Sequence, residues 1–236
     1  MSATEPRTIV ALDFVDWEST RRFVDQVTPR QCRLKVGKEL FTREGPAIVR
    51  FLQQRGFDVF LDLKFHDIPH TVAQAIQAAC DLGVWMVNVH ALGGMAMMKA
   101  AREIVERGNY SVHLIAVTIL TSLTDDDLAA VGMNGSVKEF VRRLAEAART
   151  AGLNGVVCSA HEAAMLRARI GPDWLLVTPG VRLDAISNDD QKRIMTPAQA
   201  CAAGADYLVI GRPVTCADNP SQVLLTIENE IYRVSP

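Results

Sequence analysis

The chain has 236 residues, of which 49% are hydrophobic and 22% are charged, and its formal net charge is −2. This composition is typical of a compact globular protein and is sufficient for a sizeable core. The balanced charge gives no electrostatic reason to expect nucleic acid or an anionic membrane as a partner, so any anion has to be bound by local charges.

Short apolar runs rich in β-branched residues recur along the chain, each bounded by Gly, Pro, Asn or Asp, and they predict strands. The predicted strands are residues 8–14, 32–37, 59–65, 86–91, 114–120, 155–159, 175–181 and 207–212. Segments with helical spacing lie between them, including residues 72–82, 95–106, 137–151 and 161–170.

Eight strands alternating with helices predict an α/β fold, and we expect one (β/α)8 TIM barrel domain over residues 1–236. No Gly-x-Gly-x-x-Gly fingerprint follows the first strand. This disfavours a dinucleotide-binding fold, and an open doubly wound sheet stays as the alternative. Two connections, residues 121–136 and 182–196, are longer than the barrel needs, and long loops at one end of a barrel often cover ligands.

The third predicted strand ends in charged residues, within the sequence Phe-Leu-Asp-Leu-Lys-Phe-His-Asp over residues 60–67. Because side chains alternate along a strand, Asp62 and Lys64 share one face with Phe60. A half-exposed strand could present both charges to water, whereas a barrel strand could direct both into an active-site mouth. Polar residues at other strand ends favour the second interpretation, because catalytic groups in such barrels come from the carboxyl ends of strands.

The polar residues at or just after these strand ends are Asp13, Lys35, Asp62, Lys64, Asp67 and His90. A linked set of Lys35, Asp62, Lys64 and Asp67 would be expensive to bury unless the charges paired, and pairing would keep Lys64 protonated. We therefore expect Lys64 to act as an acid. His90 could line the pocket or satisfy a core hydrogen bond, and both interpretations stay open.

The last two predicted strands end in Thr178-Pro179-Gly180-Val181-Arg182 and Gly211-Arg212-Pro213. Loops after strands seven and eight of a barrel commonly hold phosphate by backbone N–H groups, and Arg212 can add charge-assisted hydrogen bonds. Either glycine alone could serve only a tight turn. The two loops together, each with an arginine, favour a phosphate site.

These motifs, taken in order, resemble those of the orotidine 5'-phosphate decarboxylase family. The matching elements are Leu12-Asp13, Lys35-Val36-Gly37-Lys38, Asp62-x-Lys64-x-x-Asp67, Ile119-Leu120-Thr121-Ser122, Thr178-Pro179-Gly180-Val181-Arg182 and Val209-Ile210-Gly211-Arg212-Pro213. The Asp-x-Lys-x-x-Asp element alone is shared with sugar-phosphate decarboxylases and synthases of the same superfamily. The whole ordered set is more specific.

The resemblance implies decarboxylation of orotidine 5'-phosphate to uridine 5'-phosphate, the last step of UMP biosynthesis. It implies that Lys64 protonates carbon 6 of the pyrimidine as carbon dioxide leaves, with Asp62 beside the departing carboxylate. The further implied contacts are Asp13, Lys35, Asp67 and Thr71 at the ribose or in the charge network, Thr121 or less favourably Ser122 at the pyrimidine, and Arg182, Gln191, Gly211 and Arg212 at the phosphate.

The resemblance also implies a homodimer in which Asp67 and Thr71 reach into the partner's site. Pro69 follows this segment and predicts that the chain does not pass directly into a helix. No metal, flavin or nicotinamide is expected, because a fixed ammonium stands where a cofactor's electron sink would otherwise be used.

Two alternatives remain. A magnesium-dependent sugar-phosphate decarboxylase or aldolase of the same superfamily is disfavoured by Lys35, because an ammonium would repel a divalent cation where such relatives have a carboxylate. A non-catalytic nucleotide-binding barrel would keep the phosphate loops but would not need Lys64. His66 and His70 have a spacing that could suit zinc, but Pro69 separates them and no third ligand is evident.

The five cysteines are odd in number, widely separated and never spaced as Cys-x-x-Cys. A disulfide framework is therefore not expected, and a reducing compartment is favoured. Residues 1–7 lack an apolar stretch of the signal-peptide type, and no later run approaches the roughly 20 apolar residues of a membrane span. We expect a cytoplasmic protein whose partners include neither nucleic acid nor membrane.

Overall fold

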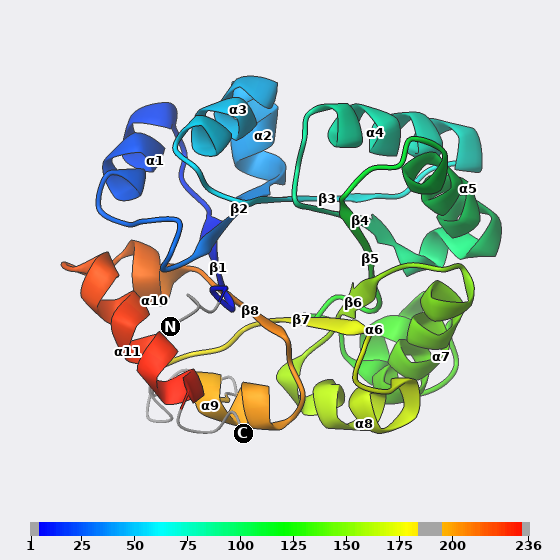
Figure 1. Cartoon of the computed structure of the whole chain (residues 1–236). Helices are drawn as coiled ribbons and strands as arrows, with labels where there is room; N and C mark the ends of the chain where they lie inside the picture. Colours follow the sequence, from blue (N-terminus) through cyan, green and yellow to red (C-terminus); the bar gives the residue numbers. More distant parts are fainter. Residues whose placement is uncertain (1–4, 184–194, 233–236) are drawn as a thin grey trace.

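The computed structural model describes residues 5–183 and 195–232. Eight parallel strands form a closed barrel in which neighbours in sequence are neighbours in space and β1 pairs with β8. Helices surround this ring (Figure 1). The predicted (β/α)8 barrel is confirmed, and the open doubly wound sheet is excluded because the ring has no free edge.

All eight predicted strands are present. They are β1 (Thr8–Leu12), β2 (Arg33–Gly37), β3 (Val59–Phe65), β4 (Met86–His90), β5 (His113–Val117), β6 (Gly155–Val157), β7 (Leu175–Pro179) and β8 (Tyr207–Ile210). Most of them end one to three residues earlier than predicted. The residues lost from the strand ends, including Asp13 and Gly211, therefore belong to the loops at the barrel mouth.

The helices follow the strands in the expected order. They are α1 (Trp17–Val24), α2 (Lys38–Glu44), α3 (Pro46–Gln54), α4 (Pro69–Asp81), α5 (Gly94–Arg107), α6 (Asp125–Ala130), α7 (Val137–Thr150), α8 (Ala160–Ile170), α9 (Pro197–Ala202), α10 (Arg212–Thr215) and α11 (Pro220–Tyr232), with the short 3₁₀ helix η1 (Ala91–Gly93) after β4. None of the helices in the described ranges has both the length and the apolar character needed to cross a lipid bilayer.

The expectation for Pro69 was wrong. Helix α4 begins at Pro69 itself, directly after the loop that carries Asp67. Proline suits the first position of a helix because its φ angle is already helical and its missing N–H would have no partner there. The same preference holds at α11, where Pro220 is the first residue and the Asn219 side chain accepts a hydrogen bond from the Gln222 amide, at 3.1 Å.

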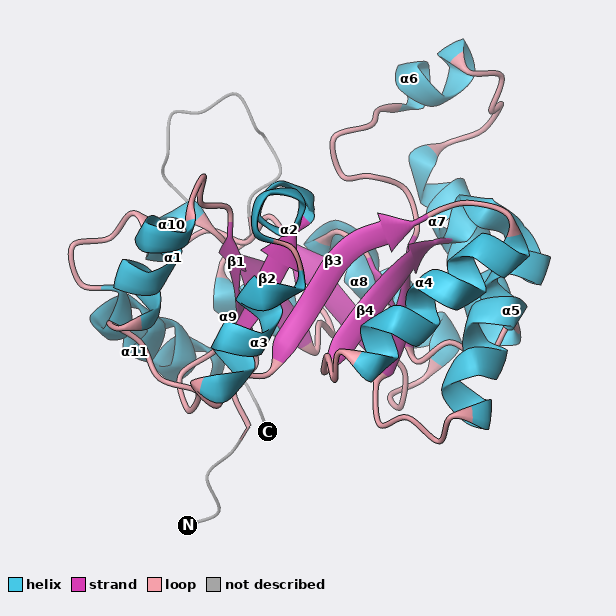
Figure 2. Cartoon of the chain, turned by 90° about the horizontal axis from the view of Figure 1, so that it is seen from above, coloured by secondary structure: helices cyan, strands magenta, loops and turns pink. Residues whose placement is uncertain are grey.

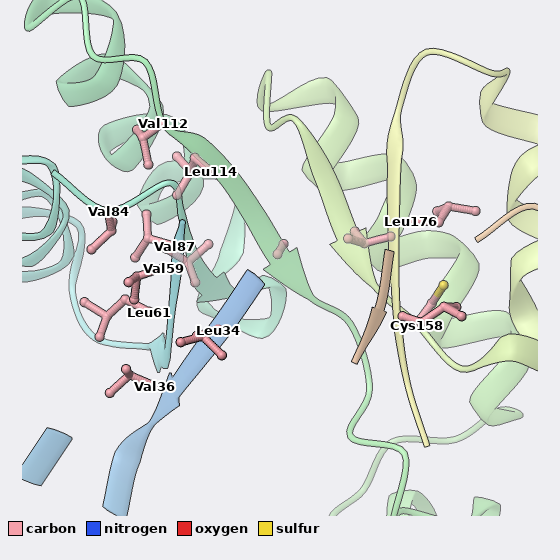
Figure 3. Packing of buried hydrophobic residues seen from close by; sticks show 14 of the residues in the cluster. Leu34, Val36, Val59, Leu61, Val84, Val87, Val112, Leu114, Cys158 and Leu176 are labelled. Atoms are coloured by element: carbon pink, nitrogen blue, oxygen red, sulfur yellow. The ribbon is translucent and has the colours of Figure 1, made fainter. Parts of the chain in front are cut away.

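The core has two layers because side chains alternate along each strand. Inward side chains from six strands fill the barrel with the apolar cluster Ile9, Ala11, Phe60, Met86, Ile115, Val177 and Val209. Outward side chains pack under the helices, as Figure 3 shows for Leu34 and Val36 of β2 and for Val59 and Leu61 of β3. The interior of the ring is therefore packed, which leaves the ends of the barrel for a ligand site formed by the strands.

The amino-terminal end of the barrel is closed by Arg33. Its side chain is 3% exposed, forms ion pairs with Glu5 and Asp58, and lies 4.4 Å from the Trp85 ring and 5.2 Å from the Tyr207 ring. Burial of a guanidinium is tolerable here because both carboxylates and two ring faces compensate its lost hydration. The carboxyl end, with its longer loops, remains as the place for a site.

Helix α6 stands apart from the ring, beyond the carboxyl ends of the strands (Figure 2). It lies within the long connection after β5, residues 121–136. A capping box between Thr124 and Asp127 begins the helix, and the Asp125 carboxylate accepts a hydrogen bond from the Val137 amide, at 2.6 Å. The hydrogen bond joins this projecting segment to the start of α7.

Candidate active site

Four charged side chains form a row across the ends of β3, β2 and β1. Lys64 Nζ lies 2.6 Å from Asp62 Oδ1, and Lys35 Nζ lies 3.3 Å from Asp62 Oδ2. Lys35 Nζ also lies 3.5 Å from Asp13 Oδ1. Charges therefore alternate along the row, and each cation has a carboxylate neighbour.

Side-chain exposure is lowest at the centre of this row and higher at its two ends. The Lys35 and Asp62 side chains are 10% and 12% exposed, Lys64 is 26% exposed and Asp13 is 69% exposed. The centre of the row is thus desolvated while its two ends remain accessible. Interactions with a charged ligand are stronger in such a place than in bulk water, because the effective dielectric constant is lower.

The pKa of Asp62 is lowered overall. Burial alone would raise it, but the charges of Lys35 and Lys64 and hydrogen bonds from Lys64 and Asn88 outweigh burial. Asp62 is therefore ionised at neutral pH, although it is almost inaccessible to water. A ligand carboxylate placed beside Asp62 would be repelled by it, while the two neighbouring ammonium groups would attract that carboxylate.

Strand β3 is irregular where it carries these charges. Its pairing with β4 shifts register between Leu61 and Phe65, and Lys64 has a φ angle of 53°. The predicted alternation still describes which faces the side chains occupy, since Phe60 lies in the inner cluster, Leu61 lies in the outer one and Lys64 pairs with Asp62. The irregularity therefore shifts the pairing with β4 without moving these side chains to the other face.

Asn88 is a site residue that was not predicted from the sequence. This residue is fully buried in β4, its Nδ2 donates a hydrogen bond to Asp62 Oδ1 at 2.7 Å, and its Oδ1 accepts one from the Lys64 amide at 2.8 Å. An asparagine in the apolar run Met-Val-Asn-Val-His was the available signal, because a buried polar side chain needs partners. The partners lie on another strand and could not be identified from the sequence.

The predicted phosphate loops lie at the same end of the barrel. A Cβ atom at Gly211 would lie 3.7 Å from Asp13 Oδ2 and 3.7 Å from the Ala11 Cβ, so the Gly211 loop adjoins the charged row. Arg212 follows at the start of α10 and is exposed. Gly180 has a φ angle of 80° at the end of β7, a conformation that favours glycine.

Arg182 lies in the loop after Gly180 and is half-buried. Its amide donates a hydrogen bond to the Met195 carbonyl, at 3.2 Å. Its backbone thus connects the two ends of the long segment after β7. Gln191, the other residue predicted to bind the phosphate from this segment, lies outside the described residues.

The predicted set of Lys35, Asp62, Lys64 and Asp67 is not formed within one chain. Asp13 takes the fourth place, while Asp67 is exposed and accepts a hydrogen bond from the Ile68 amide, at 2.7 Å. Within residues 5–183 no ion pair joins Asp67 to either lysine. The physical reason is that the chain leaves the barrel mouth after Phe65, where β3 ends.

Two further predicted contacts are also exposed. Thr71 lies in the first turn of α4, and Thr121 lies in the loop between β5 and α6. The structure therefore brings together Asp13, Lys35, Asp62 and Lys64 and places Gly211 beside them. Asp67 and Thr71 lie on the surface of the single chain.

His90 ends β4 at the barrel mouth. Its Nδ1 accepts a hydrogen bond from the Leu92 amide at 3.3 Å, and its ring stacks on His66 with 5.4 Å between centroids. Burial, followed by the charges of His66, Lys38 and Lys64, lowers the pKa of His90 to about 4. His90 is therefore neutral at physiological pH and supports the turn into η1.

No group of three or more His, Cys, Asp or Glu side chains in the described part of the chain is arranged to hold a metal ion. The Lys35 ammonium lies between the Asp13 and Asp62 carboxylates. All five cysteines are free thiols, and three of them, Cys32, Cys80 and Cys158, are buried.

A groove of about 530 Å³ lies on the outer side of β3. Leu61, Leu63 and Phe65 form its floor, and residues of α2, α3 and α4 form its walls. The groove is outside the barrel and contains none of the predicted site residues, so we do not assign the chemistry to it.

Comparison with known proteins agrees with this geometry. The model of the family described as "Orotidine 5'-phosphate decarboxylase / HUMPS family" matches residues 6–227. The orotidine 5'-phosphate decarboxylase of Saccharophagus degradans is 55% identical over 235 residues, covering 100% of this chain and 99% of that protein. That of Tolumonas auensis is 58% identical over 226 residues, covering 95% of this chain and 97% of that protein.

Solved structures show the same similarity. The crystal structure of orotidine 5'-phosphate decarboxylase from Lactobacillus acidophilus superimposes with a TM-score of 0.85 at 36% sequence identity, covering 96% of this chain and 99% of that chain. A structure of an uncharacterized conserved protein from Geobacillus kaustophilus has a TM-score of 0.83 at 40% identity, covering 95% of this chain and 99% of that chain.

Proposed function

This chain belongs to the orotidine 5'-phosphate decarboxylase family, and from that premise we propose that it converts orotidine 5'-phosphate to uridine 5'-phosphate and carbon dioxide. The observation that carries the proposal is the ionised Asp62 held between Lys64 and Lys35 at the barrel mouth. The enzyme is then a carboxy-lyase of UMP biosynthesis.

Lys64 and Asp62 have different roles in the proposed reaction. As the carboxylate leaves carbon 6 of the pyrimidine, negative charge develops on that carbon, and the Lys64 ammonium stabilises the charge and supplies the proton. Asp62 repels the substrate carboxylate. Two negative charges about 4 Å apart repel by about 4 kcal/mol at an effective dielectric constant near 20, which corresponds to about three powers of ten in rate.

The remaining barrier reduction comes from stabilisation of the carbanion and from binding energy at the phosphate. Strong enzymes lower barriers by about 8 to 23 kcal/mol, so repulsion by Asp62 alone is too small. Gly211, Arg212, Arg182 and Gln191 are the proposed phosphate contacts. Binding energy from the phosphate that is realised more fully in the transition state than in the ground state raises the rate in addition to the affinity.

The remaining contacts are assigned to the sugar and the base. Asp13 and Lys35 are proposed to bind the ribose hydroxyls, and Thr121 is proposed to bind the pyrimidine. Asp13 is exposed and lies beside both Lys35 and the Gly211 loop, which suits a group between the base and the phosphate. No step of this scheme uses a metal or an organic cofactor.

We propose a homodimer in which Asp67 and Thr71 complete the partner's site. Residues 66–71 are all exposed in one chain, and Ile68 among them is 66% exposed. An exposed large apolar side chain next to a carboxylate that forms no ion pair with any described residue is better explained by a covering subunit than by solvent. The charge network would then gain Asp67 of the partner subunit.

The magnesium-dependent alternative is disfavoured by Lys35. Its ammonium lies 3.3 Å and 3.5 Å from the two carboxylates that a divalent cation would use, and the charges of the ammonium and the metal would repel. A protein that only bound nucleotides would have no use for the pair of Lys64 and Asp62.

The direct test is to offer orotidine 5'-phosphate to protein treated with a chelator and to follow the loss of pyrimidine absorbance. We expect turnover, with one carbon dioxide released per uridine 5'-phosphate formed. Absence of turnover, with decarboxylation of a sugar phosphate only after Mg²⁺ is added, would establish the alternative instead.

We further propose that residues 1–236 form one domain and that the enzyme works in the cytoplasm. The free cysteines are consistent with a reducing compartment.

A further inference from the structure

Asn88 is a buried polar residue that the decarboxylation scheme leaves without a role. It lies in the middle of β4 with an exposure of 0%, between Val87 and Val89, which pack into the outer core. Burying a carboxamide is unfavourable unless its hydrogen bonds are made. Both of the hydrogen bonds that it forms across to β3 go to the two residues at the centre of the site, Asp62 and Lys64.

The orientation of the Asn88 carboxamide is determined by its partners. The Lys64 amide can only donate, so it requires the Asn88 oxygen, and the ionised Asp62 carboxylate can only accept, so it requires the Asn88 nitrogen. The two distances are 2.8 Å and 2.7 Å. Leucine could fill this space without either bond, and aspartate could make only one of them in its ionised form.

The backbone of Lys64 requires such support. Its φ angle of 53° lies in the left-handed region, which is strained for a residue other than glycine and persists only where surrounding contacts hold it. The irregular stretch of β3 between Leu61 and Phe65 lies opposite Asn88 of β4. The Asn88 oxygen therefore replaces a regular ladder partner for the Lys64 amide.

We propose that Asn88 is a positioning residue for the decarboxylation. It ties the Lys64 backbone and the Asp62 carboxylate to one rigid carboxamide, so that the proton donor and the repelling carboxylate keep a fixed spacing under the substrate. This inference rests on the proposed function. It adds a residue that touches neither substrate nor reacting atoms and acts through the two that do.

Kinetic measurements distinguish a positioning role of Asn88 from a purely structural one. A residue that only stabilises the barrel would change the melting temperature and leave the activity of the folded enzyme unaltered. A positioning residue lowers kcat more than it raises KM, because it acts on the geometry of the reacting groups rather than on the remote phosphate contact.

The first variant is Asn88→Ala, assayed with orotidine 5'-phosphate beside the unmodified enzyme. We expect kcat to fall by about 10- to 100-fold, with KM changed by less than about threefold, since hydrogen bonds to charged groups are lost. Loss of the Asn88 donor also removes one of the influences that lower the pKa of Asp62, so the acidic limb of the pH–rate profile is expected to move to higher pH.

The second variant is Asn88→Asp, which keeps the shape of the side chain and so guards against failure of Asn88→Ala to fold. At neutral pH it places a second carboxyl group against Asp62. When the introduced group is protonated it can again donate to Asp62 and accept from the Lys64 amide. We expect the activity of this variant relative to the unmodified enzyme to rise as the pH is lowered.

Asn154 provides a matched control. Its Oδ1 accepts a hydrogen bond from the Leu114 amide at 3.0 Å, so it also bridges to a neighbouring strand, but it precedes β6 at the opposite end of the barrel. Asn154→Ala is expected to lower the melting temperature and to leave kcat and the pH profile unchanged.

The possible results are distinct. A kcat within threefold of the unmodified value in folded Asn88→Ala, or a flat relative activity of Asn88→Asp across pH, overturns the positioning role. Equal losses of kcat in Asn88→Ala and Asn154→Ala overturn it as well, because the effect would then be general destabilisation. Lack of turnover by the unmodified enzyme would overturn the proposed function itself.

Discussion

At the scale of single residues, the properties of the site come from mutual charge compensation. Asp62 is 12% exposed and still ionised, because two ammonium groups and the Asn88 carboxamide offset its burial. A carboxyl group whose pKa is lowered by folding stabilises the protein above its ordinary titration range, and this stabilisation is lost as the pH falls toward the folded-state pKa. The row of charges is therefore expected to weaken only in acid.

Lys64→Ala is expected to lower kcat by more than about 10⁴-fold, because proton donation and charge stabilisation are lost together. The fold should remain, since Asp62 keeps Lys35 as a partner. Steady-state kinetics and circular dichroism measure the two effects. Lys99→Ala, on the exposed side of α5, serves as the control and should retain full activity. Turnover of Lys64→Ala close to that of the control would contradict the assignment of the acid.

Arg212→Ala is expected to decrease kcat and to increase KM together, with a loss in kcat/KM of about 10- to 100-fold, because the phosphate contact is expected in the ground state and to be stronger in the transition state. Kinetics over a range of orotidine 5'-phosphate concentrations separate the two constants. Arg107→Ala, whose side chain is 77% exposed at the end of α5, is the matched control. An effect on KM alone would mean that the arginine binds the ground state and the transition state equally well.

At the scale of elements, function depends on how strands end. Strand β3 carries an irregular stretch that shifts its register against β4, and strand β4 ends in His90, which caps η1. Helix α4 begins at once with Pro69, so the segment with Asp67 is held between a strand end and a helix start. A short connection of this kind keeps the charged group that it carries in place.

The end of β4 predicts a pH-dependent stability. Because the pKa of His90 is lowered to about 4 from an ordinary 6.5, the unfolded chain binds a proton that the folded chain does not in this range. Stability should therefore fall as the pH is lowered from about 6.5 to about 4 and then level off for this group. The full pKa shift corresponds to a loss of about 3 kcal/mol in the free energy of unfolding, and solvent screening should reduce this loss to about 1–2 kcal/mol.

Urea unfolding at several pH values measures this dependence in His90→Asn, which keeps an acceptor for the Leu92 amide but does not titrate. The variant should lose less stability than the unmodified protein on acidification. Burial also lowers the pKa of His113, but His113 is present in both proteins. The difference in pH dependence between His90→Asn and the unmodified protein therefore reports His90 alone. His161→Asn, at an exposed position, is the control, and identical slopes for His90→Asn and the unmodified protein would contradict the prediction.

At the scale of the whole molecule, barrel closure brings distant segments together. Asp13, Lys35, Asp62 and Gly211 come from β1, β2, β3 and β8 or from the loops that follow them, and the pairing of β1 with β8 brings the first and last of these side by side. A single chain still leaves Asp67 and Thr71 exposed. The proposed homodimer accounts for the exposure of these two residues.

Mixing two inactive variants tests the shared site. If each site uses Lys64 of one chain and Asp67 of the other, a mixed dimer of Lys64→Ala and Asp67→Asn chains contains one undamaged site and one doubly damaged site. Activity should therefore reappear after the two proteins are unfolded and refolded together, reaching about a quarter of the unmodified value for random pairing, because half of the dimers then have one intact site of two.

Unmixed Lys64→Ala and Asp67→Asn proteins refolded separately are the controls and should stay inactive. Sedimentation of the refolded mixture verifies that dimers formed. Persistent inactivity of a dimeric mixture would show that each chain builds its site alone.

Much of this protein could be predicted from local sequence. The strands, four of the helices and the barrel follow from apolar runs, turn residues and helical spacing, and Asp62 and Lys64 were placed on one face by strand alternation alone. These features depend on neighbours within a few residues, for which periodicity is a direct physical signal. The start of α4 at Pro69 was missed because a proline can either interrupt a helix or begin one.

The sequence by itself determined the chemistry available: a carboxylate and an ammonium two residues apart, a second lysine on the preceding strand, and glycine–arginine loops after the last two strands. Only the tertiary structure decided that Asp13 rather than Asp67 joins the row within one chain, and that Asn88 holds Asp62 and Lys64. These contacts link residues 22 to 26 positions apart, and their geometry is set by strand register and barrel closure, which no local pattern encodes.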